Sequence, residues 1–257
     1  MSSQNSTIPV LELQNLSKSY GTIQAVKNAN LSIKQGEVMA LVGDNGAGKS
    51  TLVKMISGAV QPSSGRILLD GQNVTIKGPL DGRNLGIETV YQDLALAPHL
   101  SVLQNMFLGR EIIKPGLLGR MFGTLDKRAM KEVAEKELNK LKIHIKSLTQ
   151  PVADLSGGQR QAVAVARSAV WGSRLLILDE PTNHLGVHEV AMVLDLIRQV
   201  RNSGVSVLYI THTIPHVFEV ADRIAVMYLG SISVVLDSKD TNMDEVVGYI
   251  TGTKVSA

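Results

Sequence analysis

The chain has 257 residues, a formal net charge of +3 and a mean hydropathy of +0.11. No stretch approaches the roughly 20 apolar residues of a membrane-spanning helix, and the absence of cysteine excludes disulfides and thiolate metal sites. We therefore expect a soluble protein with an ordinary solvated surface rather than a nucleic-acid-binding patch. The polar first seven residues do not look like a signal peptide.

The first elements that the sequence predicts are two strands of an antiparallel layer, over residues 10–16 and 29–33. Tyr20 and Gly21 lie at the expected turn between them. The apolar residues 38–42 then predict a buried strand, and residues 51–56 predict a helix that stops near Gly58.

The phosphate loop, residues 43–50, lies between this strand and this helix and fits the pattern Gly, four residues, Gly-Lys-Ser. Its glycines let backbone N–H groups wrap a phosphate, and the helix N-terminus adds a partial positive charge. Lys49 can supply a mobile cation for the β- and γ-phosphates, and the Ser50 hydroxyl can ligate Mg²⁺. The residues expected to bind a nucleotide here are Gly43, Asn45, Gly46, Ala47, Gly48, Lys49, Ser50 and Thr51.

The middle of the chain is expected to be mainly helical. Residues 88–91 predict a strand that ends at Gln92, and the Gly/Pro-rich residues 114–119 predict a loop. Beyond this loop, apolar side chains recur at helical spacing and predict a packed helix. They are Met130, Val133, Ala134, Leu138 and Leu141.

The signature run, residues 155–159, reads Leu-Ser-Gly-Gly-Gln and precedes an alanine-rich stretch with high helix propensity. Ser156, Gly157 and Gly158 are therefore expected at a helix N-terminus, which suits an anion. The chain thus has two helix starts that are predicted to bind phosphate.

The remaining polar residues of interest follow buried strands. Asp179 and Glu180 end a strand over residues 175–178, and His212 follows a strand over residues 205–211. Two acids at such a position are costly unless a cationic group requires them. Open parallel sheets bind their ligands at this end of their strands.

With its phosphate loop, signature run and acid pair, the chain resembles the ATPase subunits of ABC transporters over residues of about 11–236. The resemblance implies an α/β fold of the P-loop NTPase class. A mostly parallel sheet would form the core, with an N-terminal antiparallel β layer and an inserted helical subdomain. We expect one domain over residues 1–257, with its catalytic core in about 1–92 and 167–257 and the helical signature subdomain in about 93–166.

The resemblance also implies roles for individual residues. Tyr20 would stack on adenine, Asp179 would hold Mg²⁺, and Glu180 would be the general base that orients the attacking water. Gln92 would reach Mg²⁺ and this water, and His212 would contact the γ-phosphate. The expected catalytic residues are Glu180, His212, Lys49 and Gln92. The expected Mg²⁺ ligands are Ser50, Gln92 and Asp179.

In the family that the chain resembles, the signature run of one copy closes over the ATP held by the phosphate loop of the other. We therefore expect a head-to-tail homodimer with two ATP molecules at its interface. The residues that would contact the partner's ATP are Ser156, Gly157, Gly158 and Gln159. At Gly186 the family usually has an aspartate that helps to join the subunits, and glycine cannot supply that carboxylate.

Residues 43–48, 90–96 and 105–111 look most like those of importers of simple sugars such as ribose, galactose or fructose. This resemblance implies membrane permease subunits, contacted through the loop after Gln92, and a sugar-binding protein outside the cell. The ATPase itself would lie on the cytoplasmic face of the cell membrane. Residues 179–185 resemble the ribosome-acting branch of the family, so an ATPase that acts on ribosomes or nucleic acid is an alternative. A third hypothesis is that the chain is the ATPase of an exporter.

Overall fold

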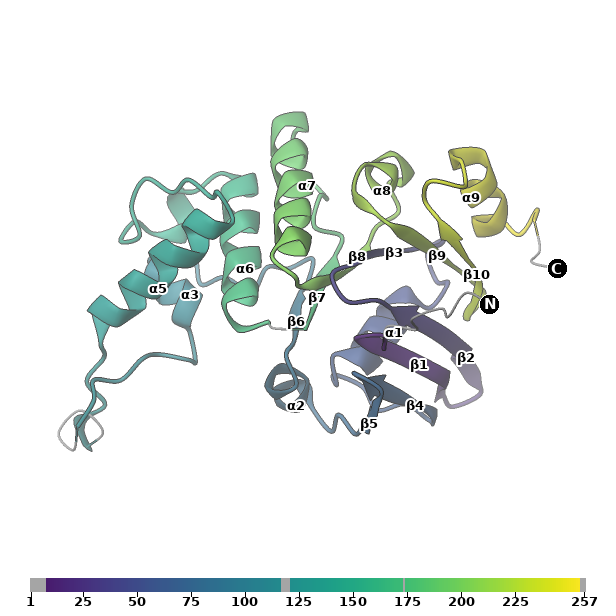
Figure 1. Ribbon diagram of the computed structural model, residues 1–257, viewed down its shortest axis with the longest axis horizontal. Coiled ribbons are helices and arrows are strands. Elements are labelled where there is room, and N and C mark those ends of the chain that lie inside the picture. Colours follow the sequence, from purple (N-terminus) through teal and green to yellow (C-terminus); the bar gives the residue numbers. More distant parts are fainter. Residues whose placement is uncertain (1–7, 117–120, 173, 255–257) are drawn as a thin grey trace, which may run out of the picture.

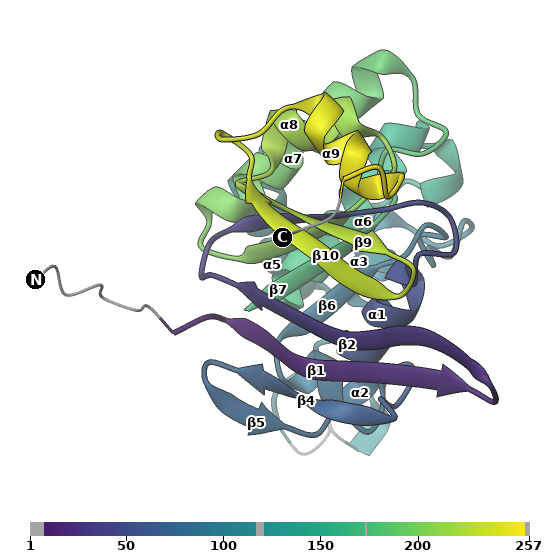
Figure 2. The same cartoon turned by 90° about the vertical axis from the view of Figure 1, so that its right-hand side faces the viewer.

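The computed structural model describes residues 8–116, 121–172 and 174–254, and its N-terminal part is an antiparallel sheet. β1 (Leu11–Tyr20) and β2 (Ile23–Ile33) form a long hairpin, which β4 (Ser64–Leu69) and β5 (Gln72–Val74) extend in the order β2-β1-β4-β5. The turn of this hairpin projects from the rest of the molecule (Figure 2).

A second sheet of six strands forms the centre of the molecule, in the order β10-β9-β3-β8-β7-β6. Its strands are β3 (Val38–Val42), β6 (Ile87–Val90), β7 (Leu175–Asp179), β8 (Ser206–Ile210), β9 (Arg223–Tyr228) and β10 (Ser231–Asp237). Strands β9, β3, β8, β7 and β6 pair in parallel, and β10 pairs antiparallel to β9 at one edge. The expected mostly parallel core with an N-terminal antiparallel layer is confirmed.

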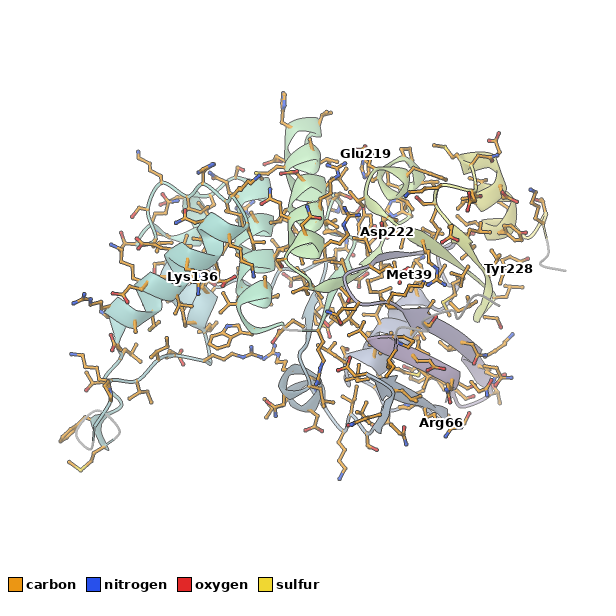
Figure 3. All side chains as sticks on the ribbon, in the orientation of Figure 1. Met39, Arg66, Lys136, Glu219, Asp222 and Tyr228 are labelled. Carbon is orange, nitrogen blue, oxygen red and sulfur yellow. The ribbon has the colours of Figure 1, made fainter. Side chains whose placement is uncertain are left out.

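Burial on both faces of the central sheet explains the continuous apolar runs of its strands. In β3, Val38 and Ala40 pack among the helices on one face, whereas Met39 and Leu41 pack toward the antiparallel sheet on the other. Figure 3 shows Met39 between these two layers. A strand with a single buried face would instead alternate apolar and polar residues.

The helices divide between the two faces of the central sheet (Figure 1). Apolar side chains of α1 pack between the two sheets, whereas α3, α5, α6, α7 and α8 contribute to the core on the opposite face. The helix bounds are α1 (Lys49–Ile56), α2 (Pro79–Asn84), α3 (Val102–Phe107), α5 (Lys127–Lys140), the 3₁₀ turn η1 (Val152–Asp154), α6 (Gly157–Trp171), α7 (Val187–Asn202), α8 (Ile214–Val220) and α9 (Met243–Ile250). In the described ranges, no helix has the length and apolar character needed to cross a membrane.

The β1–β2 hairpin is longer than the sequence predicts, and Tyr20 lies in β1 rather than in the turn. Register shifts interrupt the pairing between Leu13 and Leu16 and again between Leu16 and Ser19. Each bulge reverses the face that the following residues occupy, so the two-residue periodicity that predicts a strand is lost.

The segment from Gln92 to the signature run contains less helix than expected, because residues 92–100 and 108–120 form no helix in the part that the structure describes. Polar side chains bind the backbone there instead. Arg167 donates to the carbonyl oxygens of Leu94 and Ala95 at 3.0 and 2.9 Å, and the Asn105 amide binds Ala97 through both of its groups. Residues 117–119 of the expected loop lie outside the described residues.

Candidate active site

The phosphate loop connects β3 to α1 through two glycines that no other residue can replace without strain. Gly43 and Gly48 have φ angles of 154° and 106°. A Cβ on Gly43 would clash with the carbonyl oxygen of Met227, and one on Gly48 would lie 2.5 Å from the carbonyl oxygen of Ala25. The loop therefore requires glycine both for its backbone conformation and for the close approach of neighbouring strands.

Lys49 is folded inward against this loop. Its Nζ donates to the carbonyl oxygens of Gly43 and Asp44 at 2.7 and 3.0 Å, and only 8% of the residue is exposed. Burial lowers the pKa of Lys49, whereas the nearby carboxylates of Glu180, Asp44 and Asp179 oppose this shift. A lysine in this position can release the carbonyl oxygens and turn its charge toward a phosphate.

The backbone donors at the start of α1 are free to receive an anion. Within the described residues, the N–H groups of Gly46, Gly48, Lys49 and Ser50 donate no hydrogen bond. The helix has no side-chain cap and no acid in its first turn. Unpaired N–H groups at a helix N-terminus favour a negatively charged ligand.

The acid pair lies at the end of β7, beside the end of β8. Asp179 is the last residue of β7, and Glu180 follows with a φ of 51°, while its N–H still donates to the carbonyl oxygen of Ile210 at 3.0 Å. Burial raises the pKa of Asp179, and Glu180 adds to this shift, whereas Lys49 and Lys54 oppose it. The two acids and Lys49 thus form one coupled electrostatic cluster.

Glu180 is held by His212. The Nδ1 atom of His212 lies 2.9 Å from Oε1 of Glu180, and the second carboxylate oxygen, Oε2, is buried without a hydrogen-bond partner among the described residues. The side chain of Glu180 is 14% exposed, whereas that of His212 is 59% exposed. The arrangement leaves one buried acceptor of Glu180 without a partner in the described residues, and His212 available to a ligand from the solvent side.

Tyr20 and Gln92 are exposed and lie apart from these contacts. Tyr20 is 48% exposed at the end of β1, and the Nζ atom of Lys18 lies 5.2 Å from its ring centroid. Gln92 follows β6, which pairs with β7. Within the described residues, no hydrogen bond joins either side chain to the phosphate loop or to the acid pair.

The signature run forms the N-terminus of α6, as expected. Ser156 is the N-cap, its Oγ accepts a hydrogen bond from the N–H of Gln159 at 3.3 Å, and the Gln159 side chain accepts one from the N–H of Ser156 at 3.1 Å. Next to this capping box, Gly158 donates its N–H to Oε1 of Glu189 at 2.9 Å. Both polar side chains of the run, Ser156 and Gln159, therefore have hydrogen-bond partners within the chain.

Sequence reasoning missed Glu189. The signal was an acid three residues after Gly186, the N-cap of α7, which is the position of the glutamate in a capping box. Because Gly186 replaces the serine or threonine that normally begins such a box, the pattern was incomplete. The N–H of Gly186 nevertheless donates to Oε2 of Glu189 at 3.2 Å.

The side chains at the site suit a nucleotide with Mg²⁺ better than a metal bound by the protein alone. In residues 8–116, 121–172 and 174–254, no group of three or more His, Cys, Asp and Glu residues could hold a metal ion. The hydroxyl of Ser50 and the carboxylate of Asp179 are oxygen donors of the kind that Mg²⁺ prefers. Such a small number of protein ligands is consistent with an ion whose other ligands are phosphate oxygens.

Comparison with known proteins agrees with this geometry. Residues 26–183 match the family described as ABC transporter. The fructose import ATP-binding protein FrcA of Rhizobium meliloti is 49% identical over 247 residues, which cover 96% of this chain and 95% of that protein. The xylose/arabinose import ATP-binding protein XylG of Sulfolobus acidocaldarius is 44% identical over 242 residues, which cover 94% of each chain.

Among solved structures, the ADP conformation of MJ1267, an ATP-binding cassette of an ABC transporter, superposes with a TM-score of 0.81. It is 24% identical and covers 97% of both chains, so this likeness concerns the fold. The family match includes both the phosphate loop and the signature run. The chain therefore belongs to the ABC transporter family, as an ATP-binding and ATP-hydrolysing subunit.

Proposed function

We propose that this protein drives the import of a simple sugar by hydrolysing ATP at sites formed between two copies of the chain. The observation that carries the proposed chemistry is the Glu180–His212 pair, because its 2.9 Å contact leaves the second oxygen of Glu180 buried and unpaired. A fixed carboxylate with one free acceptor is what a general base for water requires.

In this mechanism the start of α1 binds the β- and γ-phosphates through its free N–H groups. Lys49 leaves the carbonyl oxygens of Gly43 and Asp44 and pairs with the phosphates. Glu180 orients water toward the γ-phosphate, and His212 holds Glu180 while its exposed ring contacts the same phosphate. Ser50, Gln92 and Asp179 would hold Mg²⁺, which neutralises charge on the phosphates.

The signature run would complete the site of a partner copy in a head-to-tail homodimer. Ser156, Gly157, Gly158 and Gln159 would contact the ATP that the partner's phosphate loop binds, and the Tyr20 ring would stack on the adenine. Closure is then a population shift toward the dimer, because ATP contacts both halves only in the closed state. Residues of about 93–166 would move as the helical subdomain relative to the rest of the chain.

The names of two relatives support transport of a sugar. FrcA is a fructose importer subunit and XylG a xylose/arabinose importer subunit, and each aligns over 94% or more of its length. The proposal therefore includes membrane permease subunits contacted through the loop after Gln92, an external sugar-binding protein, and a position on the cytoplasmic face of the membrane. The same relatives favour import over action on ribosomes, nucleic acid or exported compounds.

Substitution Glu180→Gln tests the catalytic proposal. The amide keeps the shape of the side chain but cannot accept a proton, so hydrolysis should fall by about 10²–10⁴-fold. ATP binding should persist, and an ATP-bound dimer should accumulate in size-exclusion chromatography with Mg²⁺. Glu219→Gln, on the exposed face of α8, is the matched control and should hydrolyse ATP normally. Rapid hydrolysis by purified Glu180→Gln would exclude Glu180 as the base.

The transport proposal is tested by isolating the protein with its partners from native membranes. Recovery of membrane subunits together with a sugar-binding protein is the expected result. Salt-sensitive recovery with ribosomes or nucleic acid would contradict it.

A further inference from the structure

The carboxylate of Glu189 bridges two helix N-termini. Its Oε1 accepts a hydrogen bond from the N–H of Gly158 at 2.9 Å, and its Oε2 accepts one from the N–H of Gly186 at 3.2 Å. Gly158 belongs to the first turn of α6, and Gly186 is the N-cap of α7. One side chain thus occupies donors from both helices.

This contact places a negative charge where the signature run is expected to bind a phosphate. The hydrogen bond from Gly158, followed by those from Gly186 and from the Ser156 side chain, lowers the pKa of Glu189. The ionised carboxylate is therefore the form that the signature run stabilises. An anion at this helix start is favoured by the unpaired N–H groups and by the helix dipole, whether it belongs to a side chain or to a ligand.

The packing around Gly158 keeps Glu189 in this position. A Cβ on Gly158 would lie 2.9 Å from Cβ of Glu189 and 2.7 Å from Cε of Met192. Because glycine has no side chain, the first turn of α7 can approach the first turn of α6 closely enough for the carboxylate to reach the N–H.

Gly186 fits the same arrangement. A Cβ on Gly186 would lie 3.9 Å from Oε2 of Glu189. An aspartate at this position would bring a second carboxylate next to the first, and two like charges at this distance repel each other. With glycine at this position, the backbone N–H of Gly186 binds Glu189 and no second carboxylate repels it. The absence of the family's usual aspartate thus permits the observed position of Glu189.

We propose that Glu189 is an internal competitor for the phosphate that the signature run binds, so that closure over a partner's ATP requires Glu189 to release the N–H of Gly158. One N–H cannot serve the carboxylate and a phosphate oxygen together, and the two anions repel each other. The hydrogen bond between Gly158 and Glu189 stabilises the free, open chain. It therefore raises the ATP concentration needed for dimerisation. The inference rests on the proposed function, because it assumes closure over ATP in trans.

The test compares variants in a Glu180→Gln background, in which the ATP-bound dimer accumulates. The ATP concentration for half-maximal dimerisation is measured by analytical ultracentrifugation with Mg²⁺. Glu189→Gln removes the charge and one of the two acceptors, and should lower this concentration by about tenfold, within the usual range of coupling between sites. Glu189→Ala removes both acceptors and should lower it at least as much.

Asp195→Asn is the matched control, because it removes a carboxylate from the exposed face of the same helix, where Asp195 accepts a hydrogen bond from Gln199 at 2.6 Å. It should leave the half-maximal concentration unchanged. Thermal unfolding of the free chains provides a second readout. Both Glu189 variants should unfold at a lower temperature than the parent although they dimerise more readily, whereas a merely structural role would weaken stability and dimerisation together.

The outcomes separate the two proposals. If the Glu180→Gln parent does not dimerise with ATP, the proposed function fails and the inference fails with it. If the parent dimerises but the Glu189 variants need the same or more ATP, the inference alone is wrong.

Discussion

Helices α1 and α6 both begin at a motif expected to bind phosphate, yet their first turns are satisfied in different ways. At α1 the N-cap is Gly48, no side chain caps the helix, and the backbone donors are free within the described residues. At α6 the capping box and the carboxylate of Glu189 occupy the N–H groups of Ser156, Gly158 and Gln159. The first helix start is open to a ligand, whereas three donors of the second already have partners within the chain.

The difference follows from what each helix start must do in the proposed cycle. The phosphate loop is expected to bind ATP first, in the single chain, so free donors there give affinity. The signature run is expected to bind only after a second chain arrives, so donors left unpaired until then would be costly. Internal partners remove this cost and can be exchanged for phosphate on closure.

Among changes that compare the two helix starts, the largest effect is expected from removing the cation at the open one. Lys49→Ala should reduce ATP turnover by about 10²–10³-fold, as loss of one group that stabilises transition-state charge does in other enzymes. The measurement is steady-state phosphate release, with nucleotide binding followed in parallel. Lys54→Ala, on the same helix, is the control. Normal turnover by Lys49→Ala would show that the open helix start is not the catalytic phosphate site.

A smaller effect is expected from the cap of the second helix start, and the chain offers a close control. Ser101 caps α3 with Gln104 in the same type of capping box that Ser156 forms with Gln159. Ser156→Ala and Ser101→Ala should each lower the free energy of unfolding by about 1 kcal/mol. Only Ser156→Ala should also weaken ATP-dependent dimerisation in the Glu180→Gln background. Equal dimerisation of the two variants would mean that Ser156 acts only as a helix cap.

The smallest effect concerns the free energy of unfolding and Asp179, at the end of β7, whose carboxylate interacts with Lys49 of the open helix start. Because burial and Glu180 raise the pKa of Asp179, the folded chain keeps this proton to a higher pH than the unfolded chain. Stability from this group is therefore lost as the pH rises through the window between the ordinary pKa of 3.8 and the raised one.

Asp179→Asn should remove this loss and make the chain slightly more stable at neutral pH, while ATP hydrolysis falls. Urea unfolding of both proteins between pH 4 and 7 is the measurement, and the advantage of the variant should grow with pH. A variant that is less stable throughout this range would contradict the expected cost of the buried acid.

Much of the fold follows from local patterns. The apolar run of β3 is buried on both faces, and the phosphate loop ends in a helix because Gly48 allows a left-handed N-cap. The predictions were wrong where residues far apart in the sequence determine the local structure. Bulges obscured the periodicity of the β1–β2 hairpin, and side chains such as Arg167 and Asn105 bind the backbone of residues 94–97 in place of a helix.

The sequence by itself determined the family, the class of fold and the two helix starts, because a glycine loop with Lys49 and the signature run each specify their chemistry over a few adjacent residues. Only the tertiary structure decided which donors are free. Glu180 meets His212 across neighbouring strands, and Glu189 meets Gly158 across neighbouring helices. Hydrogen bonds between residues so far apart in the chain depend on strand pairing and helix packing, which short motifs do not encode.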